Sequence, residues 1–563
     1  MNSLKYLLIF ATTLVSVVSC KPKDDKMVQS EVQNKPNILW IVCEDISPTL
    51  SFYGDSTAHT PNLDKLANES LVYDNAFATV GVCAPCRSSI ITSMYPTTIG
   101  TMHMRTGQDV QSWGNRSYKT REELGRNDIT GKPIRQYSAV IPPEVKCFTE
   151  YLRADGYYCT NNQKTDYQFA APVTAWDENN RKAHWRNRPE GKPFFSVFNI
   201  DDTHESKLWK HEDLPLTINP DSVYVPPYFP DNAASKHMVA RNYSNIELMD
   251  AKVGAILKEL EEDGLYDNTI VFFYSDHGGP LPREKREIYD SGLKTPFLIK
   301  DINNKTTGRT DRLISYVDLG ATVLSLAGVK PPEYMEGKAF RGKYDSQRRD
   351  YVFGSSDRFD EYSDRIRSVR NKQFLYLRNY FPELPKYKDV SYRKQIPMMS
   401  NFLKLEKEGK LNEVQHGWFE TKTKEELYDC NKDPFNINNL ADDPIYADIL
   451  NDMRTAFGDH YEDRADMGQM PEAKLIDIMW PNFKQPKTEH PTILDNNGKV
   501  AIQCATEGAS IAYIISDSPD KKLDLNSHWQ LYTKPFSVVK GKYVYSMAQR
   551  IGFKESPIVA KKI

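Results

Sequence analysis

The segment PNILWIVCED, residues 36–45, contains the clearest strand signal in this chain. Every position from Ile38 to Val42 is apolar. A short run that is apolar on both faces is typical of a central strand in a parallel sheet. The run ends in the acidic pair Glu44-Asp45, which places two carboxylates at the carboxyl end of the predicted strand.

Two further segments repeat this arrangement of an apolar strand followed by polar residues. The run TIVFFY, residues 269–274, precedes Asp276-His277, and the run FFSVFNI, residues 194–200, precedes Asp201-Asp202-Thr203-His204. Apolar residues recur at helical spacing over 246–260, which predicts a helix between two strands and hence an α/β sheet. Ligands of open parallel sheets bind at the carboxyl ends of the strands, so we expect these polar groups to meet in space.

The pentapeptide CAPCR, residues 83–87, combines two cysteines, a proline and an arginine. Proline is favoured where a helix begins, because its missing N–H would be unpaired there anyway. We expect a helix over Arg87 to Met94, with Cys83 at its N-terminus, where unpaired N–H groups favour an anion. The alternative interpretation is a buried cysteine pair beside the start of a helix.

The bulk properties exclude some classes of function. The chain has 563 residues, a net charge of −3 and 26% charged residues, so it lacks the basic field of a nucleic-acid-binding protein. Its eight cysteines are too few for a disulfide scaffold. The length allows several domains, or one large catalytic unit with a smaller appendage.

The N-terminus predicts export. Lys5 precedes an apolar stretch from Tyr6 to Val18, which is too short to span a membrane and suits a signal peptide. The stretch ends in VVSC, residues 17–20, which resembles a bacterial lipobox. This resemblance implies a lipoprotein signal peptide over 1–19, a lipid on Cys20 and a tether over 20–35. We therefore expect a lipoprotein of the cell envelope, at the outer membrane or periplasmic face and held by lipid alone; an ordinary signal peptide is the alternative.

The remainder of the chain divides into three parts. We expect a catalytic α/β domain over 36–345, a C-terminal subdomain over 346–480 and a β-rich module over 486–563. The last part contains strand-like runs at Ser510–Ile515 and Phe536–Val539. It is similar to β-sandwich modules at the C-termini of glycan-degrading enzymes, although a packing role is the alternative to sugar binding.

Taken together, these separated motifs resemble the type I sulfatases over about residues 36 to 475. The pentapeptide resembles the Cys-x-Pro-x-Arg signature of that family, in which a maturation enzyme oxidises the first cysteine to formylglycine (3-oxoalanine). The resemblance implies that Cys83 is this cysteine. It also implies an alkaline-phosphatase-like α/β sandwich, with a large, mostly parallel central sheet, a smaller C-terminal α/β subdomain and a β-rich tail.

The resemblance further implies one Ca²⁺ ion per chain, held by oxygen-rich ligands. The expected ligands are Glu44, Asp45, Asp276, His277 and an oxygen of modified Cys83. Glutamate takes the first place of the acidic pair, where the family commonly has aspartate. Imidazole is not a usual calcium ligand, so the alternative role of His277 is to orient a sulfate or nucleophile oxygen.

Four cationic or titratable side chains complete the implied site. Arg87 would hold the hydrate and the metal ligands in place, and Lys164 and Lys285 would contact the sulfate. His204 falls on the histidine that gives a proton to the leaving group. One position departs from the family pattern: Asp166 stands where a histidine is usual, and a charged aspartate cannot act as a cationic donor.

Substrate and partners follow from the same resemblance. The chain most resembles bacterial enzymes that desulfate polysaccharides such as ulvan or glycosaminoglycans. Candidate sugar contacts are His103, Arg105 and Arg358, with Tyr157 as a further possibility on neighbourhood alone. Two alternatives stay open. One is a phosphoester or phosphonate hydrolase of the same fold, and the other is a glycan-binding protein in which Cys83 stays unmodified.

Overall fold

The computed structural model describes residues 35–106 and 123–563. The predicted signal peptide, Cys20, which we predict to carry a lipid, and nearly all of the predicted tether lie outside these residues. Residues 36–563 form one compact unit. In the part of the chain that the structure describes, no helix is both long and apolar enough to cross a membrane.

The largest sheet contains eight strands. They are β1 (Asn37–Cys43), β2 (Leu71–Phe77), β5 (Tyr158–Asn162), β6 (Glu178–Asn179), β7 (Phe194–Ile200), β8 (Thr269–Ser275), β9 (Phe297–Lys300) and β10 (Gly308–Ser315). Their order is β10-β2-β9-β8-β1-β7-β5-β6, and only β9 runs antiparallel to its neighbours. The sheet is therefore mostly parallel, as the sequence predicts.

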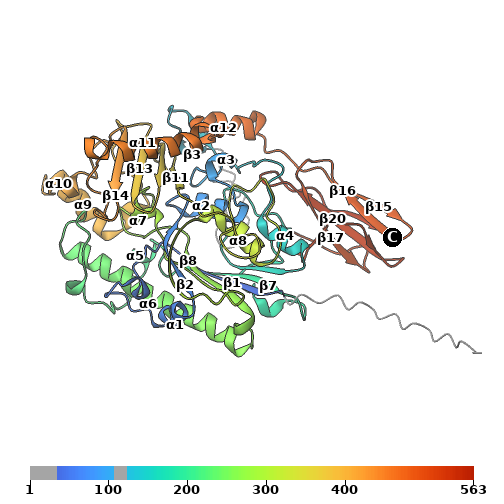
Figure 1. Cartoon of the computed structure of the whole chain (residues 1–563). Coiled ribbons are helices and arrows are strands. Elements are labelled where there is room, and N and C mark those ends of the chain that lie inside the picture. The colour runs from blue at the N-terminus through green and yellow to red at the C-terminus, as the bar shows by residue number, and fades with distance from the viewer. Residues whose placement is uncertain (1–34, 107–122) are drawn as a thin grey trace, which may run out of the picture. The chain divides into compact units, whose positions relative to one another are not determined.

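The described residues also form twelve α-helices. They are α1 (Pro61–Asn68), α2 (Cys83–Thr92), α3 (Pro96–Ile99), α4 (Phe148–Ala154), α5 (Lys207–Lys210), α6 (Ala233–Glu262), α7 (Asp290–Leu293), α8 (Leu319–Leu326), α9 (Pro397–Lys407), α10 (Glu413–His416), α11 (Ala447–Phe457) and α12 (Glu472–Met479). Helices α1 and α6 cover one face of the large sheet, and α2, α4 and α8 cover the other (Figure 1).

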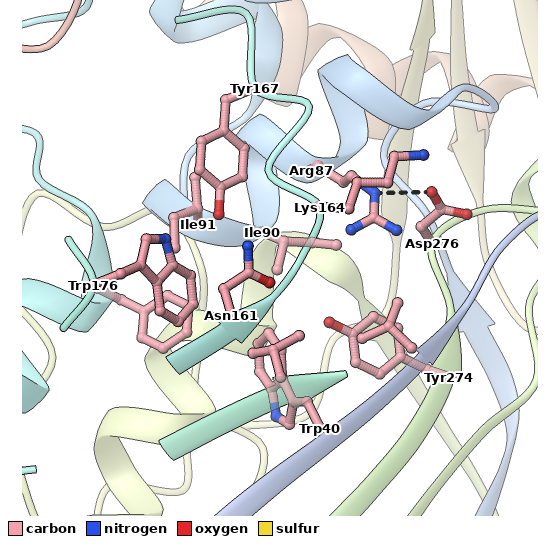
Figure 2. Close-up of a pocket in the computed structure, with 13 residues that line it drawn as sticks. Trp40, Arg87, Ile90, Ile91, Asn161, Lys164, Tyr167, Trp176, Tyr274 and Asp276 are labelled. Carbon is pink, nitrogen blue, oxygen red and sulfur yellow. Dashed lines mark hydrogen bonds and ion pairs between the residues drawn. The ribbon is translucent and has the colours of Figure 1, made fainter. Parts of the chain in front are cut away.

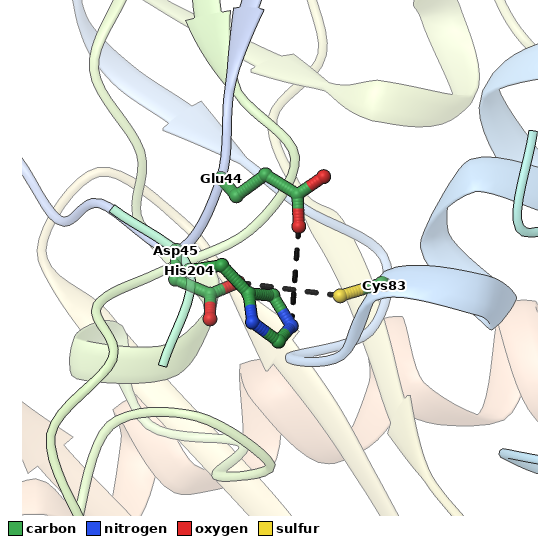
Figure 3. Close-up of side chains that lie close together, drawn as sticks. All are labelled: Glu44, Asp45, Cys83 and His204. Carbon is green, nitrogen blue, oxygen red and sulfur yellow. Dashed lines mark hydrogen bonds and ion pairs between the residues drawn. The ribbon is translucent and has the colours of Figure 1, made fainter. Parts of the chain in front are cut away.

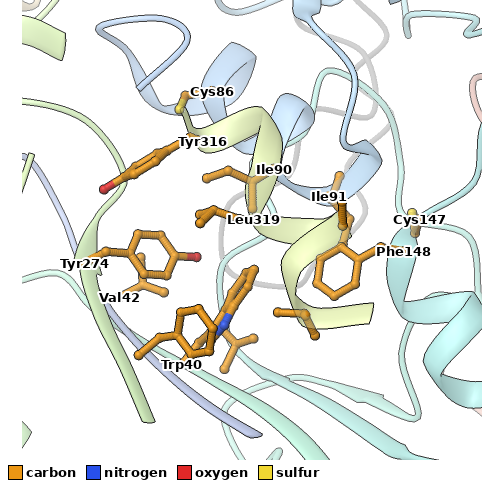
Figure 4. Packing of buried hydrophobic residues seen from close by; sticks show 14 of the residues in the cluster. Trp40, Val42, Cys86, Ile90, Ile91, Cys147, Phe148, Tyr274, Tyr316 and Leu319 are labelled. Atoms are coloured by element: carbon orange, nitrogen blue, oxygen red, sulfur yellow. The ribbon is translucent and has the colours of Figure 1, made fainter. Parts of the chain in front are cut away.

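Alternation along β1 explains this sandwich. Leu39 and Ile41 face the core shared with α1 and α6. Trp40 and Val42 face the opposite core, where Ile90 of α2 and residues of α4 and α8 pack against them (Figure 4). Both faces of the strand are buried, so an uninterrupted apolar run is required.

Smaller sheets follow the large one in sequence. An antiparallel sheet joins β11 (Val352–Ser356), β12 (Ile366–Arg370), β13 (Phe374–Asn379) and β14 (Glu425–Asp429). Near the C-terminus, one sheet contains β15 (Thr492–Asn496), β16 (Lys499–Gln503) and β19 (Phe536–Ser537). Another contains β17 (Ser510–Ser516), β18 (Gln530–Leu531), β20 (Tyr543–Gln549) and β21 (Val559–Lys562). Separately, β3 (Glu123–Asn127) pairs with β4 (Pro133–Arg135). The predicted fold class is confirmed, whereas the division at 345 and 485 stays a prediction.

One predicted boundary differs from the structure. We expected a helix beginning at Arg87, but α2 begins at Cys83 and ends at Thr92. Val82 is its extended N-cap residue, so Pro85 lies inside the first turn. Proline is tolerated there because the first N–H groups of a helix have no intrahelical partner. Cys83 is thus the first residue of the helix itself.

Candidate active site

The site lies where three neighbouring parallel strands end. β1 lies between β7 and β8, and Cys43 pairs with Ile200 on one side and Ser275 on the other. Because the strands are in register, the residues that follow them emerge at the same edge of the sheet. This brings Glu44-Asp45, His204 and Asp276-His277 together, as expected from the sequence. Asp201 and Asp202 instead form ion pairs with Lys207 and Lys252.

Helix α2 directs its first residue into this group. The Cys83 Sγ atom lies 3.3 Å from His277 Nε2 and 4.0 Å from Asp45 Oδ1. Figure 3 shows Cys83 pointing from the helix towards Glu44, Asp45 and His204. A reactive side chain thus lies at a helix N-terminus, where the positive end of the helix dipole favours an anion.

Three buried carboxylates surround Cys83. Ligand atoms of Asp45, Cys83, Asp276 and His277 all lie within 4.8 Å of one another, and so do those of Glu44, Asp45, Cys83 and His204. Asp45 adopts a left-handed backbone conformation with φ 51°, which turns its carboxylate into the cluster. Such backbone strain in a non-glycine residue concentrates at functional sites.

Cationic side chains bind the same carboxylates. Lys164 Nζ donates to Glu44 Oε2 at 2.6 Å, and Lys285 Nζ donates to Asp45 Oδ2 at 2.5 Å. Arg87 donates to Asp276 Oδ2 at 3.0 Å and to Glu44 Oε1 at 3.2 Å. The three cations that the sequence singles out therefore all reach the predicted metal ligands.

The charges of this cluster change its acid–base properties. Burial raises the pKa of Glu44. Burial acts the same way on Asp276 and Asp45, but nearby cations outweigh it and lower the pKa of Asp276 to about 2 and that of Asp45 well below its usual range. Burial opposes charging of His277, yet Asp276 and Asp45 raise its pKa to about 10. The carboxylates Asp276 and Asp45 thus favour the charged form of the His277 ring.

This donor set fits a hard divalent cation. Glu44, Asp45 and Asp276 offer carboxylate oxygens, which calcium prefers. A cysteine thiol would not suit such an ion, whereas an oxygen at the position of Cys83 Sγ would. The residues present therefore fit calcium best if Cys83 carries oxygen instead of sulfur.

His204 lies at the edge of the cluster. Its Nε2 atom is 4.0 Å from Glu44 Oε2, and Ser206 N donates to its Nδ1 atom at 3.2 Å. Ser206 Oγ also lies 2.9 Å from Nδ1, so Ser206 holds this nitrogen and leaves Nε2 on the side of Glu44. Burial and the charge of Lys285 hold the pKa of His204 well below its usual range.

Asp166 is fully buried behind Lys164 and bonded to Arg105. Arg105 Nη1 donates to Asp166 Oδ1 at 2.9 Å, and Lys164 Nζ lies 3.7 Å from Asp166 Oδ2. The residue that departs from the family pattern is therefore a carboxylate between two cations.

The other candidate sugar contacts lie in different surroundings. Arg358 is buried, and its guanidinium donates to both carboxylate oxygens of Glu472 and to the carbonyl of Met104. Its donors are used inside the protein, which argues against contact with sugar. His103 is also buried, and its Nδ1 atom lies 3.7 Å from Glu472 Oε2. Tyr157 is buried as well, and its hydroxyl donates a hydrogen bond to the carbonyl of Pro36.

Two site residues escaped the sequence analysis. Asn199 accepts from Arg87 Nη1 at 2.8 Å, and Glu205 gives its backbone N–H to Asp45 Oδ2 at 2.7 Å. The Glu205 carboxylate also lies 3.4 Å from Lys285 and binds Arg286 with both oxygens. Their places after or within β7 are the signal that could have revealed them.

A small cavity lies behind the site. Its volume is about 30 Å³, and it extends from Trp40 and Tyr274 in the core to Arg87, Lys164 and Asp276 (Figure 2). This volume suits about one water molecule and cannot admit a sugar. This cavity is therefore not the binding site for the sugar.

The fold and this cluster of carboxylates, cations and a helix-terminal side chain define a hydrolase of anionic esters. The family model for sulfatases matches residues 36–329, and that for the C-terminal region of N-sulphoglucosamine sulphohydrolase matches residues 283–415. The chain belongs to the sulfatase family and is a sulfuric ester hydrolase.

Several known proteins are similar over most of their length. An ulvan-active sulfatase of Formosa agariphila is 42% identical, covering 98% of this chain and 97% of the relative. Human N-sulphoglucosamine sulphohydrolase is 26% identical over 74% of this chain and 88% of its own. A solved 2-O GAG sulfatase has a TM-score of 0.53 at 18% identity, covering 76% of this chain and 92% of that one.

Proposed function

We propose that this protein hydrolyses sulfate esters of a sulfated polysaccharide or its oligosaccharides, ulvan-like or glycosaminoglycan-like, through a formylglycine formed from Cys83 at a calcium ion. The observation that carries the proposal is the position of Cys83 Sγ, 3.3 Å from His277 and beside three buried carboxylates. The 42% identity to an ulvan-active sulfatase supports the choice of substrate.

Glu44, Asp45, Asp276 and an oxygen of modified Cys83 would hold the ion, with His277 as a fifth ligand or as an orienting group. When bound, calcium polarises the sulfate oxygens and favours ionisation of the aldehyde hydrate. Arg87 fixes two of these ligands from helix α2 and so keeps their carboxylates aimed at one point.

The hydrated aldehyde supplies two hydroxyl groups to the reaction. One hydroxyl attacks sulfur, the bond from sulfur to the sugar oxygen breaks, and the sugar alcohol leaves with a proton. The second hydroxyl then loses its proton, the aldehyde re-forms, and sulfate departs from the same carbon. A water molecule rehydrates the aldehyde, so water never has to attack the sulfated enzyme. A serine could complete only the first half.

Lys164, Lys285 and His204 serve the charged groups of this reaction. The two ammonium groups neutralise charge that develops on the sulfate oxygens. As an imidazolium, His204 would give its Nε2 proton to the departing alkoxide, and Ser206 Oγ, 2.9 Å from Nδ1, can accept a hydrogen bond from the proton that stays on the ring. Bound sulfate adds negative charge beside this ring and so counteracts the lowering of its pKa.

The proposal includes a formylglycine-generating maturation enzyme as a partner. It also includes delivery to the cell envelope as a lipoprotein that is anchored by a lipid on Cys20. The lipobox-like residues 17–20 support this lipid anchor. Globomycin-insensitive processing, or an unacylated Cys20, would contradict it.

The fold alone does not choose between sulfate and phosphorus esters. A phosphonate monoester hydrolase of Silicibacter pomeroyi has a TM-score of 0.52 at 14% identity, covering 77% of this chain and 96% of that one. Discrimination must therefore come from a direct comparison of substrates.

We would co-express the chain with a formylglycine-generating enzyme and measure release of sulfate from defined ulvan and glycosaminoglycan oligosaccharides. Aryl sulfate and aryl phosphate are compared in parallel. We expect release of sulfate that Cys83→Ala abolishes and the matched variant Cys86→Ala retains. Faster release of phosphate, or binding of glycan without any turnover, would contradict the proposal.

A further inference from the structure

Arg105 differs from the other cations at the site in its exposure. Its side chain is 37% exposed, whereas those of Lys164, Lys285 and Arg87 are 4%, 2% and 7% exposed. The three buried cations are bonded to the predicted metal ligands. Arg105 is instead bonded to Asp166 and keeps more than a third of its side chain exposed.

Asp166 fixes the guanidinium of Arg105. The carboxylate is fully buried and accepts from Arg105 Nη1 at 2.9 Å. Both residues adopt left-handed backbone conformations, with φ 62° at Arg105 and φ 47° at Asp166. A non-glycine residue adopts this conformation at a cost, and two such residues joined by an ion pair indicate a geometry that the surrounding fold enforces.

Arg105 also lies within electrostatic reach of the reacting groups. Burial and the charge of Lys285 are the main causes of the lowered pKa of His204, and Lys164 and Arg105 add to them. Burial alone would lower the pKa of Arg105, but Asp166, Asp360 and Cys83 together raise it. The guanidinium is therefore charged, and through Asp166 and Lys164 it is linked to Glu44, one of the carboxylates beside Cys83.

We propose that Arg105, positioned by Asp166, binds a second anionic group of the substrate next to the scissile sulfate. A guanidinium recognises carboxylate and sulfate oxygens alike, because its planar N–H groups match paired oxygens. The second group is thus the carboxylate of a uronic acid or another sulfate. This inference rests on the proposed function, since it presupposes a sulfated saccharide in the site.

The inference also gives Asp166 a role at the position where the family has histidine. Asp166 is a positioning residue that acts through Arg105, and its other oxygen faces Lys164 at 3.7 Å. A neutral side chain there would weaken the ion pair that holds Arg105 Nη1. Substrate recognition would then lose the preorganised donor.

Binding is measured by calorimetry in a Cys83→Ala background, so that no turnover is needed. The probes are a monosulfated disaccharide with a uronic acid, its carboxyl-reduced analogue and a disulfated neutral disaccharide. Release of sulfate from an aryl sulfate by wild-type protein reports separately on the proposed function. Failure of that assay therefore leaves the binding result interpretable.

We expect Arg105→Met to weaken binding of at least one dianionic probe by about 10- to 100-fold, the range of a hydrogen bond to a charged group. The affinity of Arg105→Met for the carboxyl-reduced analogue should fall less than about threefold. Arg105→Lys should bind the dianionic probe with an affinity between those of Arg105→Met and the unchanged residue. Loss confined to the uronic acid probe identifies a carboxylate, and loss confined to the disulfated probe identifies a sulfate.

Asp166→Asn should weaken the same probe, and the double variant should bind no worse than Arg105→Met, because Asp166 acts through Arg105. The matched control is Arg186→Met. The Arg186 side chain is 44% exposed and bonded to Asp263, and it precedes the start of β7, whereas the site follows the end of that strand. Equal losses for all three probes, no loss for any, or fully additive losses in the double variant would overturn the inference.

Discussion

Arg87 Nε lies 3.0 Å from Asp276 Oδ2, although 189 positions separate the two residues. The same guanidinium reaches Glu44, so one side chain from helix α2 binds acids that follow two different strands. This contact ties the helix that carries Cys83 to the carboxylates around it. The proposed nucleophile and the proposed metal ligands are thereby linked through one side chain.

Replacing Arg87 should therefore damage both chemistry and stability. Arg87→Lys keeps the charge but cannot bind Asp276 and Glu44 together, so we expect sulfate release to fall about 10²- to 10³-fold. Leaving buried carboxylates unpaired typically costs about 3–5 kcal/mol, so thermal unfolding should also move to lower temperature.

The matched control is Arg349→Lys. In the native protein the guanidinium of Arg349 binds Asp318, away from the site. It should lose stability and keep its rate per folded molecule. Equal loss of rate in both variants would show that Arg87 acts only through folding.

His204 should matter most when the leaving group is poor. We expect His204→Gln to slow release of sulfate from a sugar by about 10²- to 10⁴-fold, the usual range for a general acid. The loss should be smaller with a nitrophenyl sulfate, whose phenolate leaves without a proton. Equal losses on the two substrates, measured by steady-state kinetics, would contradict the role of His204 as acid.

Calcium should stabilise the folded protein. A ligand that binds only the folded state at a hundredfold excess over its Kd contributes about 2.7 kcal/mol. We expect a chelator to abolish activity and lower Tm, and added Ca²⁺ to restore both. Asp276→Asn should lose most of the calcium-dependent rise in Tm. Activity that survives thorough chelation would contradict the proposed ligand set.

A buried histidine outside the site should make the fold sensitive to acid. Burial, aided by Arg464 and Arg349, lowers the pKa of His460 to about 3. The unfolded chain takes up a proton below about pH 6.5, whereas the folded ring stays neutral, so stability falls towards acid by up to about 1.4 kcal/mol per pH unit.

His460→Phe keeps an aromatic ring that can stack on Phe353, as the His460 ring does, and removes the group that titrates. Its Tm should therefore drop less between pH 7 and pH 5 than that of the wild type. The control His490→Gln, at an exposed position, should behave as wild type. An unchanged pH dependence in His460→Phe would contradict the prediction.

The sequence predicted the centre of the site because parallel strands align their carboxyl ends. Asp45, Asp276 and His204 each follow a strand that an apolar run reveals, and β1 lies between the other two. The start of α2 was placed too late, because proline is tolerated throughout the first turn and does not mark its first residue.

Residues at the periphery could not be predicted, because their partners come from distant segments. Arg105 and Asp166 are 61 positions apart, and nothing local shows that they pair. Arg358 was a candidate sugar contact on neighbourhood alone, but it is buried and its guanidinium donates to Glu472, 114 positions away. Asn199 belongs to the site only because β7 lies beside β1.

The central claim is that Cys83 becomes the nucleophile by oxidation. Mass spectrometry of the peptide spanning Cys83, from protein made together with a formylglycine-generating enzyme, tests it most directly. We expect a peptide in which one oxygen replaces the sulfur and two hydrogens of the cysteine, and which reacts with an aldehyde-specific hydrazide. A peptide with the intact thiol mass, from protein that nevertheless releases sulfate, would contradict the account.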